Sequence, residues 1–380
     1  MLSSQQKFWN GYARFVQKPV IALIGHQPTV RRIADLSAAI TLKTPGDLTL
    51  TEKHLGLGTD SVRTTVCQIG PTPTGGSMLY LHGGAFMIGN LRGYRHLVSE
   101  LGKAANQIGH FLHYGLAPEH RFPTALDQAT FAFEALCAAP DAGPISLVGD
   151  SAGGNLVFAL LHRICSRGLQ KPVAVAAIAP ISDLRLTNAS LETNVGSDHL
   201  VPMRWIVRGK DAYLGGHDPS DPEVSPVLGT FVGAPPCLLH VDETEILVDD
   251  SKALANRLRD QGVTTEVPKF KGRTHVWHLN VGRCPEADDS VQEIGAFIRK
   301  QVARRSRTFG LLELMLFVSS RSSRSMRGRH NSSHWVVRCE CLLRPQSRHS
   351  SKLQKTTAMR TKLQFAVLIA GETRGPKRPF

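Results

Sequence analysis

The sequence predicts an α/β fold in which helices cover both faces of a mostly parallel central sheet. Two observations carry this prediction. Short apolar runs typical of buried strands recur between residues 49 and 300, and segments with apolar residues at helical spacing separate them. In such sheets, reacting groups lie on the loops that leave the carboxyl ends of the strands.

The expected elements follow in chain order. Residues 1–48 are expected to be helical, because Val30, Ile33 and Ala34 follow helical spacing and Pro45-Gly46 ends the segment. Strands are expected at Met78–Leu81, Phe111–Tyr114, Ile145–Val148, Val173–Ala179, Cys237–Val241 and Thr264–Phe270. Helices are expected at Gly93–Asn106, Pro123–Ala138, Asn155–Arg167, Ile246–Arg259 and Glu286–Val302. Proline in the first turn of the second helix and Gly168 after the third are typical helix boundaries.

Charge separates the body of the chain from its last part. The chain carries 45 Lys+Arg against 31 Asp+Glu, a net charge of +14, and residues 301–380 alone hold 17 basic and 3 acidic residues. The first 300 residues are therefore neutral overall. Residues 303–380 are rich in arginine and serine and are expected to form a disordered tail. Such a tail would attract nucleic acid or anionic membrane, but no RNA-binding motif elsewhere supports that role, and we do not expect it.

Cysteine usage and the apolar runs indicate the compartment. The seven cysteines include no CxxC pair, which favours free thiols in a reducing environment. The first residues lack the order of a signal peptide, and the best apolar run near them, Val20 to Gly25, is far below the roughly 20 residues of a membrane span. We expect a soluble, cytoplasmic protein with no membrane span.

The strongest local signal is Gly149-Asp150-Ser151-Ala152-Gly153, a G-x-S-x-G pattern. A predicted strand precedes it and a predicted helix follows it, which is the context in which this pattern places a serine on a tight strand-to-helix turn. A chance pentapeptide in such a turn is the alternative. We predict Ser151 as a nucleophile.

A second glycine motif follows the first expected apolar strand. The segment Leu81-His82-Gly83-Gly84-Ala85-Phe86 would let backbone N–H groups approach a reacting oxygen closely. Gly83 and Gly84, together with the N–H of Ala152 beside the nucleophile, are predicted to form an oxyanion hole. A plain glycine-rich turn would explain the glycines but not their position ahead of the serine motif.

A serine nucleophile needs a histidine base and an acid that orients it. His275 follows the expected strand Thr264–Phe270 and is the preferred base, whereas His278 would point elsewhere and His240 lies inside a strand. The acid is expected after the strand Cys237–Val241, where the residues themselves leave three candidates open: Asp242, Glu243 and Glu245.

Six segments match motifs that occur together in one family: HGGAF (82–86), YGLAPEHRFPTALDQ (114–128), GDSAGGN (149–155), DPEVSP (221–226), VDETEILVDDS (241–251) and GRTHVWHL (272–279). Through them, residues 1–300 resemble the hormone-sensitive lipase family of α/β-hydrolase esterases. The resemblance implies an α/β-hydrolase catalytic domain over 49–302. It also implies a helical cap built from residues 1–48 and an insertion at about 184–215.

The resemblance also implies roles for single residues. His275 takes the position of the base, and Glu245, which lies 30 residues before it, takes the position of the acid. Many members have aspartate at this position, so Asp242 stays as the alternative acid. His82 is expected to hold the oxyanion loop. Gly115 stands where the family usually has an arginine.

The activity implied is that of a serine carboxylic ester hydrolase acting on small, short-acyl esters through an acyl-enzyme. It requires no cofactor and no metal, and the histidine pairs spaced by three, such as His110 with His113, are expected among sixteen histidines. The alternatives are hydrolysis of a lactone or an aryl formamide by the same triad, and a receptor-like member that binds a ligand without catalysis. The oligomeric state does not follow from the sequence.

Overall fold

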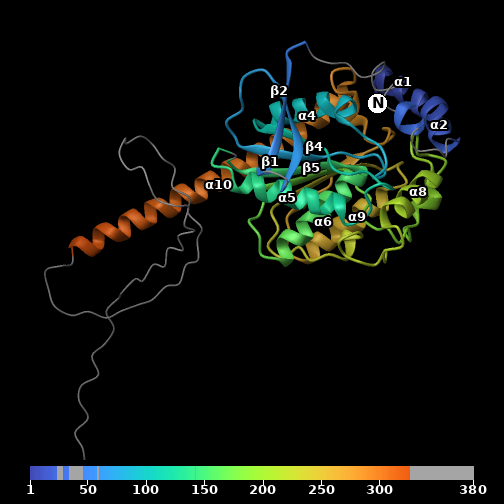
Figure 1. Cartoon of the computed structure of the whole chain (residues 1–380). Coiled ribbons are helices and arrows are strands. Elements are labelled where there is room, and N and C mark those ends of the chain that lie inside the picture. Colours follow the sequence, from blue (N-terminus) through green and yellow to red (C-terminus); the bar gives the residue numbers. More distant parts are fainter. Residues whose placement is uncertain (24–28, 34–45, 58–59, 142, 326–380) are drawn as a thin grey trace, which may run out of the picture. The chain divides into compact units, whose positions relative to one another are not determined.

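Nine strands build the central sheet of the fold, in the spatial order β1-β2-β4-β3-β5-β6-β7-β8, with β9 pairing with β7 (Figure 1). Their bounds are β1 (Leu48–Leu57), β2 (Asp60–Ile69), β3 (Ser77–Leu81), β4 (Ile108–Leu112), β5 (Ile145–Asp150), β6 (Ala174–Ile178), β7 (Cys237–Asp242), β8 (Thr265–Glu266) and β9 (Lys269–Phe270). β1 with β2 and β2 with β4 are antiparallel, and the other pairs are parallel. The predicted mostly parallel sheet is confirmed.

The structure is a computed structural model that describes residues 1–23, 29–33, 46–57, 60–141 and 143–325. Residues Met1–Arg307 form one compact unit, and Thr308–Phe380 form a second. Part of the predicted N-terminal helical segment, residues 34–45, lies outside the described residues, as does the tail beyond residue 325.

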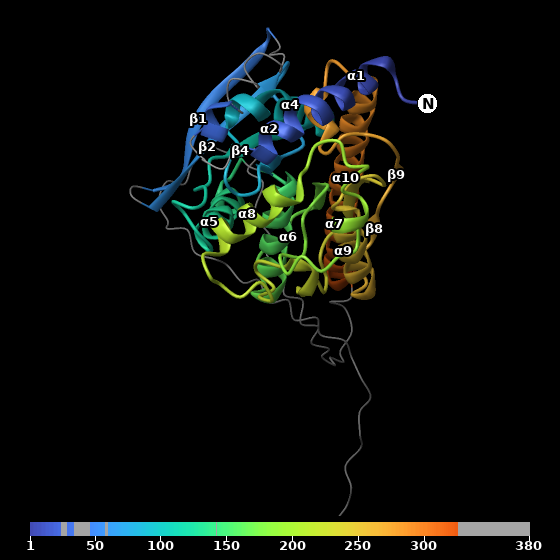
Figure 2. The ribbon, with the colours of Figure 1, turned by 90° about the vertical axis from the view of Figure 1, so that its right-hand side faces the viewer.

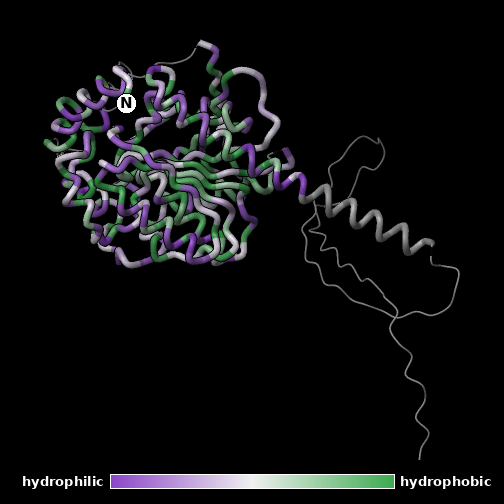
Figure 3. The backbone as a smooth tube through the Cα atoms, turned by 180° about the vertical axis from the view of Figure 1, so that it is seen from behind, coloured by the Kyte–Doolittle hydropathy of each residue, from purple (hydrophilic) through white to green (hydrophobic). Residues whose placement is uncertain are grey.

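Helices cover both faces of the sheet, as predicted. Met78 and Tyr80 of β3 pack in one core with α4 (Leu91–Ala105) and the first turns of α10 (Pro285–Ser325). Leu79 and Leu81 point to the opposite core, which contains α5 (Thr124–Ala138), α6 (Ser151–Ser166) and α9 (Val248–Asp260). This alternation follows from the two-residue period of a strand. Both faces are buried, so the central strands are largely hydrophobic (Figure 3).

Two segments that are distant in sequence form helices beside each other at one end of the sheet. The first comprises α1 (Ser4–Tyr12), the π-helix η1 (Ala13–Gln17) and α2 (Lys18–Leu23), and the second comprises α7 (Ser190–Thr193) and α8 (Met203–Leu214). α2 contacts α8 (Figure 2). The Lys18 ammonium joins the segments by donating to the carbonyl oxygens of Val195 at 2.9 Å and Asp198 at 2.7 Å. These are the two segments predicted to form the cap.

Two features of the sheet differ from the prediction. Strands β1 and β2 were not expected, although the alternation of apolar and polar residues, as in Leu48, Thr49, Leu50 and Thr51, is typical of a strand with one buried face. The strand expected over Thr264–Phe270 is divided into β8 and β9. Pro268 stands between the two pieces, and proline has no N–H to donate to a neighbouring strand.

The last helix is longer than predicted. It was expected over Glu286–Val302, but α10 continues to Ser325, well into the segment expected to be disordered. The residues after Val302 are rich in arginine and leucine, which have high helix propensity, and no proline interrupts them up to Ser325. The structure thus describes the backbone of 303–325 as helical, and the disorder expected of the tail stays a prediction.

Two findings bear on the expected compartment. Among the described residues, no helix combines the length and the apolar character needed to cross a membrane. In that part of the chain, Cys67, Cys165, Cys237 and Cys284 are free thiols. A cytoplasmic location stays a prediction.

A buried arginine fixes the position of α6, which follows β5 directly. The Arg163 guanidinium donates to both carboxylate oxygens of Glu223, at 2.6 and 2.7 Å, and to Asp127 of α5 at 2.6 Å. The Arg163 side chain is 5% exposed and that of Glu223 is 23% exposed. A bidentate pair of this kind is directional and only weakly screened by solvent.

We expect Arg163→Met to lower the free energy of unfolding by about 2–3 kcal/mol, because it leaves the Glu223 carboxylate partly buried without its partner. Urea denaturation measures this. Arg167 is the matched control, since its contact with Glu223 is longer, at 3.7 Å, and its side chain is 55% exposed. Arg167→Met should cost less than about 1 kcal/mol. Equal losses in the two variants would contradict the assignment.

Candidate active site

Ser151 lies on a sharp turn between β5 and α6. Its φ is +52°, in the left-handed region that non-glycine residues rarely adopt. A Cβ on Gly149 would lie 2.6 Å from the carbonyl oxygen of Gly153, and a Cβ on Gly153 would clash with the carbonyl oxygen of Leu81. The close approach of the turn to β3 therefore requires both glycines of the predicted pattern, and the strained backbone holds the serine at the carboxyl end of β5.

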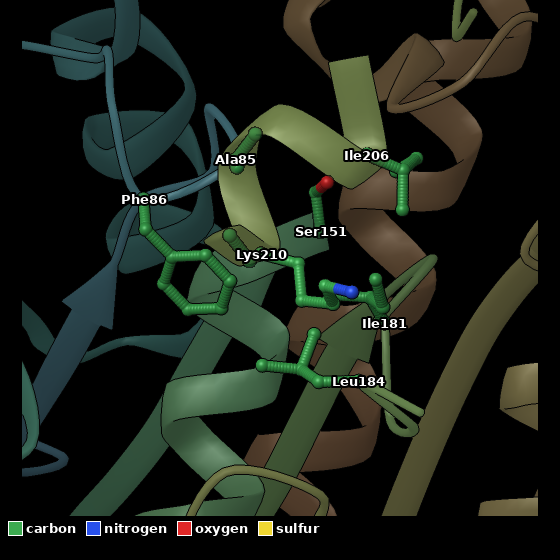
Figure 4. A pocket seen from close by; sticks show the side chains of 9 residues that line it. Ala85, Phe86, Ser151, Ile181, Leu184, Ile206 and Lys210 are labelled. Atoms are coloured by element: carbon green, nitrogen blue, oxygen red, sulfur yellow. The ribbon is translucent and has the colours of Figure 1, made fainter. Parts of the chain in front are cut away.

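A narrow pocket opens beside Ser151 (Figure 4). The empty space in and at the mouth of this pocket, open solvent included, amounts to about 230 Å³. Its lining consists of Ala85, Phe86, Ser151, Ala152, Ile181, Leu184, Ile206, Gly209 and Lys210. Ile206, Gly209 and Lys210 belong to α8, so a helix of the predicted cap forms one wall of the pocket.

His275 and Glu245 form a buried pair. Nδ1 of His275 lies 2.5 Å from Oε2 of Glu245, and the two side chains are 7% and 1% exposed. Burial by itself lowers the pKa of His275, but the Glu245 carboxylate and its hydrogen bond outweigh burial and raise that pKa above its ordinary value. The carboxylate of Asp150, the residue before Ser151, also interacts with His275. The imidazole is therefore within electrostatic reach of the residue that precedes the serine.

The two other candidate acids have different positions. The Asp242 carboxylate accepts hydrogen bonds from the backbone N–H groups of Thr244, Gly272 and Arg273, each at 2.8–2.9 Å. It thus ties the loop after β7 to the loop that leads to His275. Glu243 is exposed. Among the three candidates, the structure brings only Glu245 into contact with the imidazole.

The oxyanion loop differs from the prediction in one residue. The Gly83 N–H donates to Oδ1 of Asp150 at 2.9 Å, and because a residue has a single N–H, this group is not available for a substrate oxygen. Within the described part of the chain, the N–H groups of Gly84 and Ala85 have no such partner. Ala152 is in the first turn of α6, where backbone N–H groups are free of the helix ladder. Ala85 thus replaces Gly83 among the available donors.

Buried polar groups hold this loop against β5. Asp150 also accepts hydrogen bonds from the hydroxyls of Tyr80 at 2.8 Å and Tyr94 at 3.2 Å, and burial raises its pKa to about 6. The His82 ring stacks on Tyr114 with ring centroids 4.3 Å apart, and burial lowers its pKa to about 4. A neutral, stacked imidazole agrees with the expectation that His82 holds the loop.

The sequence analysis missed Asp198, which connects the predicted cap with the loop that carries Glu245. Its carboxylate accepts hydrogen bonds from the N–H groups of Leu200 and Val201, both at 2.8 Å, and from Ile246 at 3.0 Å. Asp198 is 1% exposed. A single aspartate in a cap segment gives no sequence signal, since such residues are mostly exposed.

A metal ion would need several side chains that converge on it as ligands. Among the residues that the structure describes, no group of three or more histidine, cysteine, aspartate or glutamate side chains is arranged to hold one. The expectation that the chemistry needs no metal stays a prediction.

Comparisons with known proteins identify the family of the chain and solved structures that share its fold. Residues 78–279 match the model of a family described by the alpha/beta hydrolase fold. An acetyl-hydrolase of Streptomyces hygroscopicus is 36% identical over 227 residues, which are 59% of this chain and 76% of that protein. The crystal structure of an esterase/lipase from an uncultured bacterium has a TM-score of 0.73 at 28% identity, covering 79% of this chain and 99% of the other. That of an esterase from the bacterial hormone-sensitive lipase family has a TM-score of 0.72 at 30% identity, covering 80% and 99%.

We expect Glu245→Gln to lower the pKa of His275, because the variant removes the nearby negative charge and leaves burial to act on the imidazole. Titration of the His275 ring followed by NMR measures the change. Glu243→Gln, which removes the charge of an exposed neighbour, should leave the titration as it is. An unchanged His275 titration in Glu245→Gln would show that the pair does not exist in solution.

Proposed function

The chain belongs to the α/β-hydrolase family, and from this premise we propose that it hydrolyses small, short-acyl carboxylic esters with Ser151 as nucleophile, His275 as base and Glu245 as acid. As the sequence predicted, it is an enzyme of the carboxylesterase and lipase class, like the relatives described above. One observation carries the assignment of the triad: His275 and Glu245 form a buried pair, and the imidazole is within electrostatic reach of Asp150, the residue that leads into the strained turn at Ser151.

The first half of the reaction forms an acyl-enzyme. Nε2 of His275 takes the proton from Ser151 Oγ as this oxygen attacks the ester carbonyl carbon. Glu245 accepts the hydrogen bond from Nδ1–H, which sets the tautomer and stabilises the imidazolium that forms. The N–H groups of Gly84, Ala85 and Ala152 stabilise the tetrahedral oxyanion. The C–O bond to the alcohol then breaks, and His275 gives the proton to the leaving alkoxide.

The second half releases the acid. His275 takes a proton from a water molecule, and the hydroxyl attacks the carbonyl carbon of the acyl-enzyme. The same N–H groups stabilise the second oxyanion. When the bond to Ser151 Oγ breaks, His275 returns the proton to the serine, and the enzyme is regenerated.

The shape of the pocket supports small substrates. Phe86, Leu184 and Ile206 lie around an empty space of about 230 Å³ that Ser151 shares with them (Figure 4). Long acyl chains need a larger apolar channel. The name of the acetyl-hydrolase among the relatives is in line with a short acyl group.

The His275–Glu245 pair also bears on the alternative of a ligand-binding protein without catalysis. A binding pocket does not need an imidazole whose pKa is raised by a buried carboxylate, and placing that carboxylate inside the protein costs desolvation. The pair is therefore best accounted for by general-base catalysis.

We expect Ser151→Ala to lower kcat/KM for p-nitrophenyl butyrate by about 10⁴-fold or more, because no other group supplies the attacking oxygen. Release of p-nitrophenolate gives the rate. Ser166→Ala is a matched control at the other end of α6, where the side chain is exposed. Its activity should equal that of the wild type. Full activity of a folded Ser151→Ala variant would exclude the proposed nucleophile.

We expect kcat/KM to rise with pH through an inflection above 6.5, the ordinary pKa of histidine. Only neutral His275 accepts the serine proton, and Glu245 favours the protonated form, so activity is lost as the pH falls through the raised pKa. A pH profile of the free enzyme with p-nitrophenyl butyrate measures this. A flat profile, or an inflection below 6.5, would contradict the proposed base.

A further inference from the structure

We propose that the pocket beside Ser151 is selective for esters that carry a carboxylate a few carbons from the scissile ester bond, and that Lys210 binds this carboxylate. The inference rests on the proposed ester hydrolysis and adds the substrate class. A half-ester of a short dicarboxylic acid has this chemistry, as does an acetyl ester of a short hydroxy acid.

The lining of the pocket contains a single charge. Of its nine residues, the only charged side chain is that of Lys210. Apart from Ser151, the other side chains of the lining are apolar, and Lys210 lines the same recess as Ser151, Ile181 and Leu184 (Figure 4). The Lys210 side chain is 25% exposed, so three quarters of it is removed from solvent.

The backbone that carries Lys210 is held tightly. Gly209, the preceding residue of α8, lies so close to the oxyanion loop that a Cβ on it would be 2.6 Å from the carbonyl oxygen of Ala85. Trp205 and Ile206 of the same helix are buried. The position of Lys210 relative to the oxyanion loop therefore follows from close packing, and its flexible stem accounts for the remaining freedom.

Among the described residues, the Lys210 ammonium forms an ion pair with Asp211, which leaves hydrogen-bond donors of the ammonium available. Its Nζ lies 3.2 Å from Oδ1 of Asp211, whose side chain is 64% exposed. Such a pair at the surface contributes about 0–1 kcal/mol. An ammonium has three N–H donors, so a substrate carboxylate can bind a second one without displacing Asp211.

The electrostatic consequence is a preference between substrates. A neutral acyl or alcohol group that fills the pocket removes water from the ammonium and returns no hydrogen bond, which is unfavourable. A carboxylate in the same place replaces that water with a charge-assisted hydrogen bond. Because Ser151 and Lys210 line one small pocket, a short substrate can contact both.

The test compares matched esters in a pH-stat. Monoethyl succinate and ethyl butyrate have a four-carbon acyl group with and without the carboxylate. The pair 4-acetoxybutanoate and butyl acetate places the carboxylate in the alcohol instead. For one of these pairs, we expect kcat/KM of the wild type to be at least about tenfold higher for the anionic ester, mainly through KM, and the pair that shows it identifies which part of the ester faces Lys210.

Variants assign the preference to the charge. Lys210→Met should reduce the anionic-to-neutral ratio of kcat/KM about tenfold, and Lys210→Arg, which keeps the charge, should retain most of it. Lys103→Met is the control, since Lys103 is an exposed lysine of α4 outside the pocket. If the anionic-to-neutral ratio is the same in the wild type and in Lys210→Met for both ester pairs, while neutral esters are still hydrolysed, the role of Lys210 is overturned and the proposed ester hydrolysis is not. A folded wild type that hydrolyses none of the four esters would overturn the proposed function itself.

Discussion

The candidate site depends on the hydrogen bonds that the buried carboxylate of Asp150 accepts. This carboxylate accepts hydrogen bonds from the Gly83 N–H and from the hydroxyls of Tyr80 and Tyr94, while its own backbone leads directly into the strained turn at Ser151. One side chain therefore sets the distance between the proposed nucleophile and the oxyanion loop. The contact between the turn and the carbonyl oxygens of Leu81 and His82, which leaves room only for glycine, adds to this constraint.

Three other buried carboxylates hold the loops around His275, each through different contacts. Glu245 contacts His275, Asp242 holds the loop before His275, and Asp198 ties the predicted cap to Ile246, the residue after Glu245. Each carboxylate receives its hydrogen bonds mainly from backbone N–H groups or from the imidazole, which offsets the cost of burial. The position of the imidazole thus depends on two loops and on the segment predicted to form the cap.

The predicted cap segment after β6 also contributes to the pocket, because α8 forms one of its walls. Ile206 and Gly209 supply a wall that packs on the oxyanion loop, and Lys210 supplies the charge inside it. The catalytic groups that we propose come from the loops of the sheet, whereas the groups that we expect to select the substrate come from a helix outside it. This separation lets one reaction serve different esters.

The sequence by itself determined the parallel sheet, the turn at Ser151 and the loop that carries His275, since apolar runs and obligatory glycines are local requirements of the backbone. The alternating strands β1 and β2 and the extension of α10 beyond Val302 were not predicted from the sequence. The family resemblance favoured Glu245 over Asp242, but only the tertiary structure shows which carboxylate contacts His275 and that the N–H of Ala85, not that of Gly83, is an available donor. These choices depend on which group each carboxylate and each N–H contacts across the fold. Residues two or three positions apart are equivalent in sequence until distant loops supply their partners.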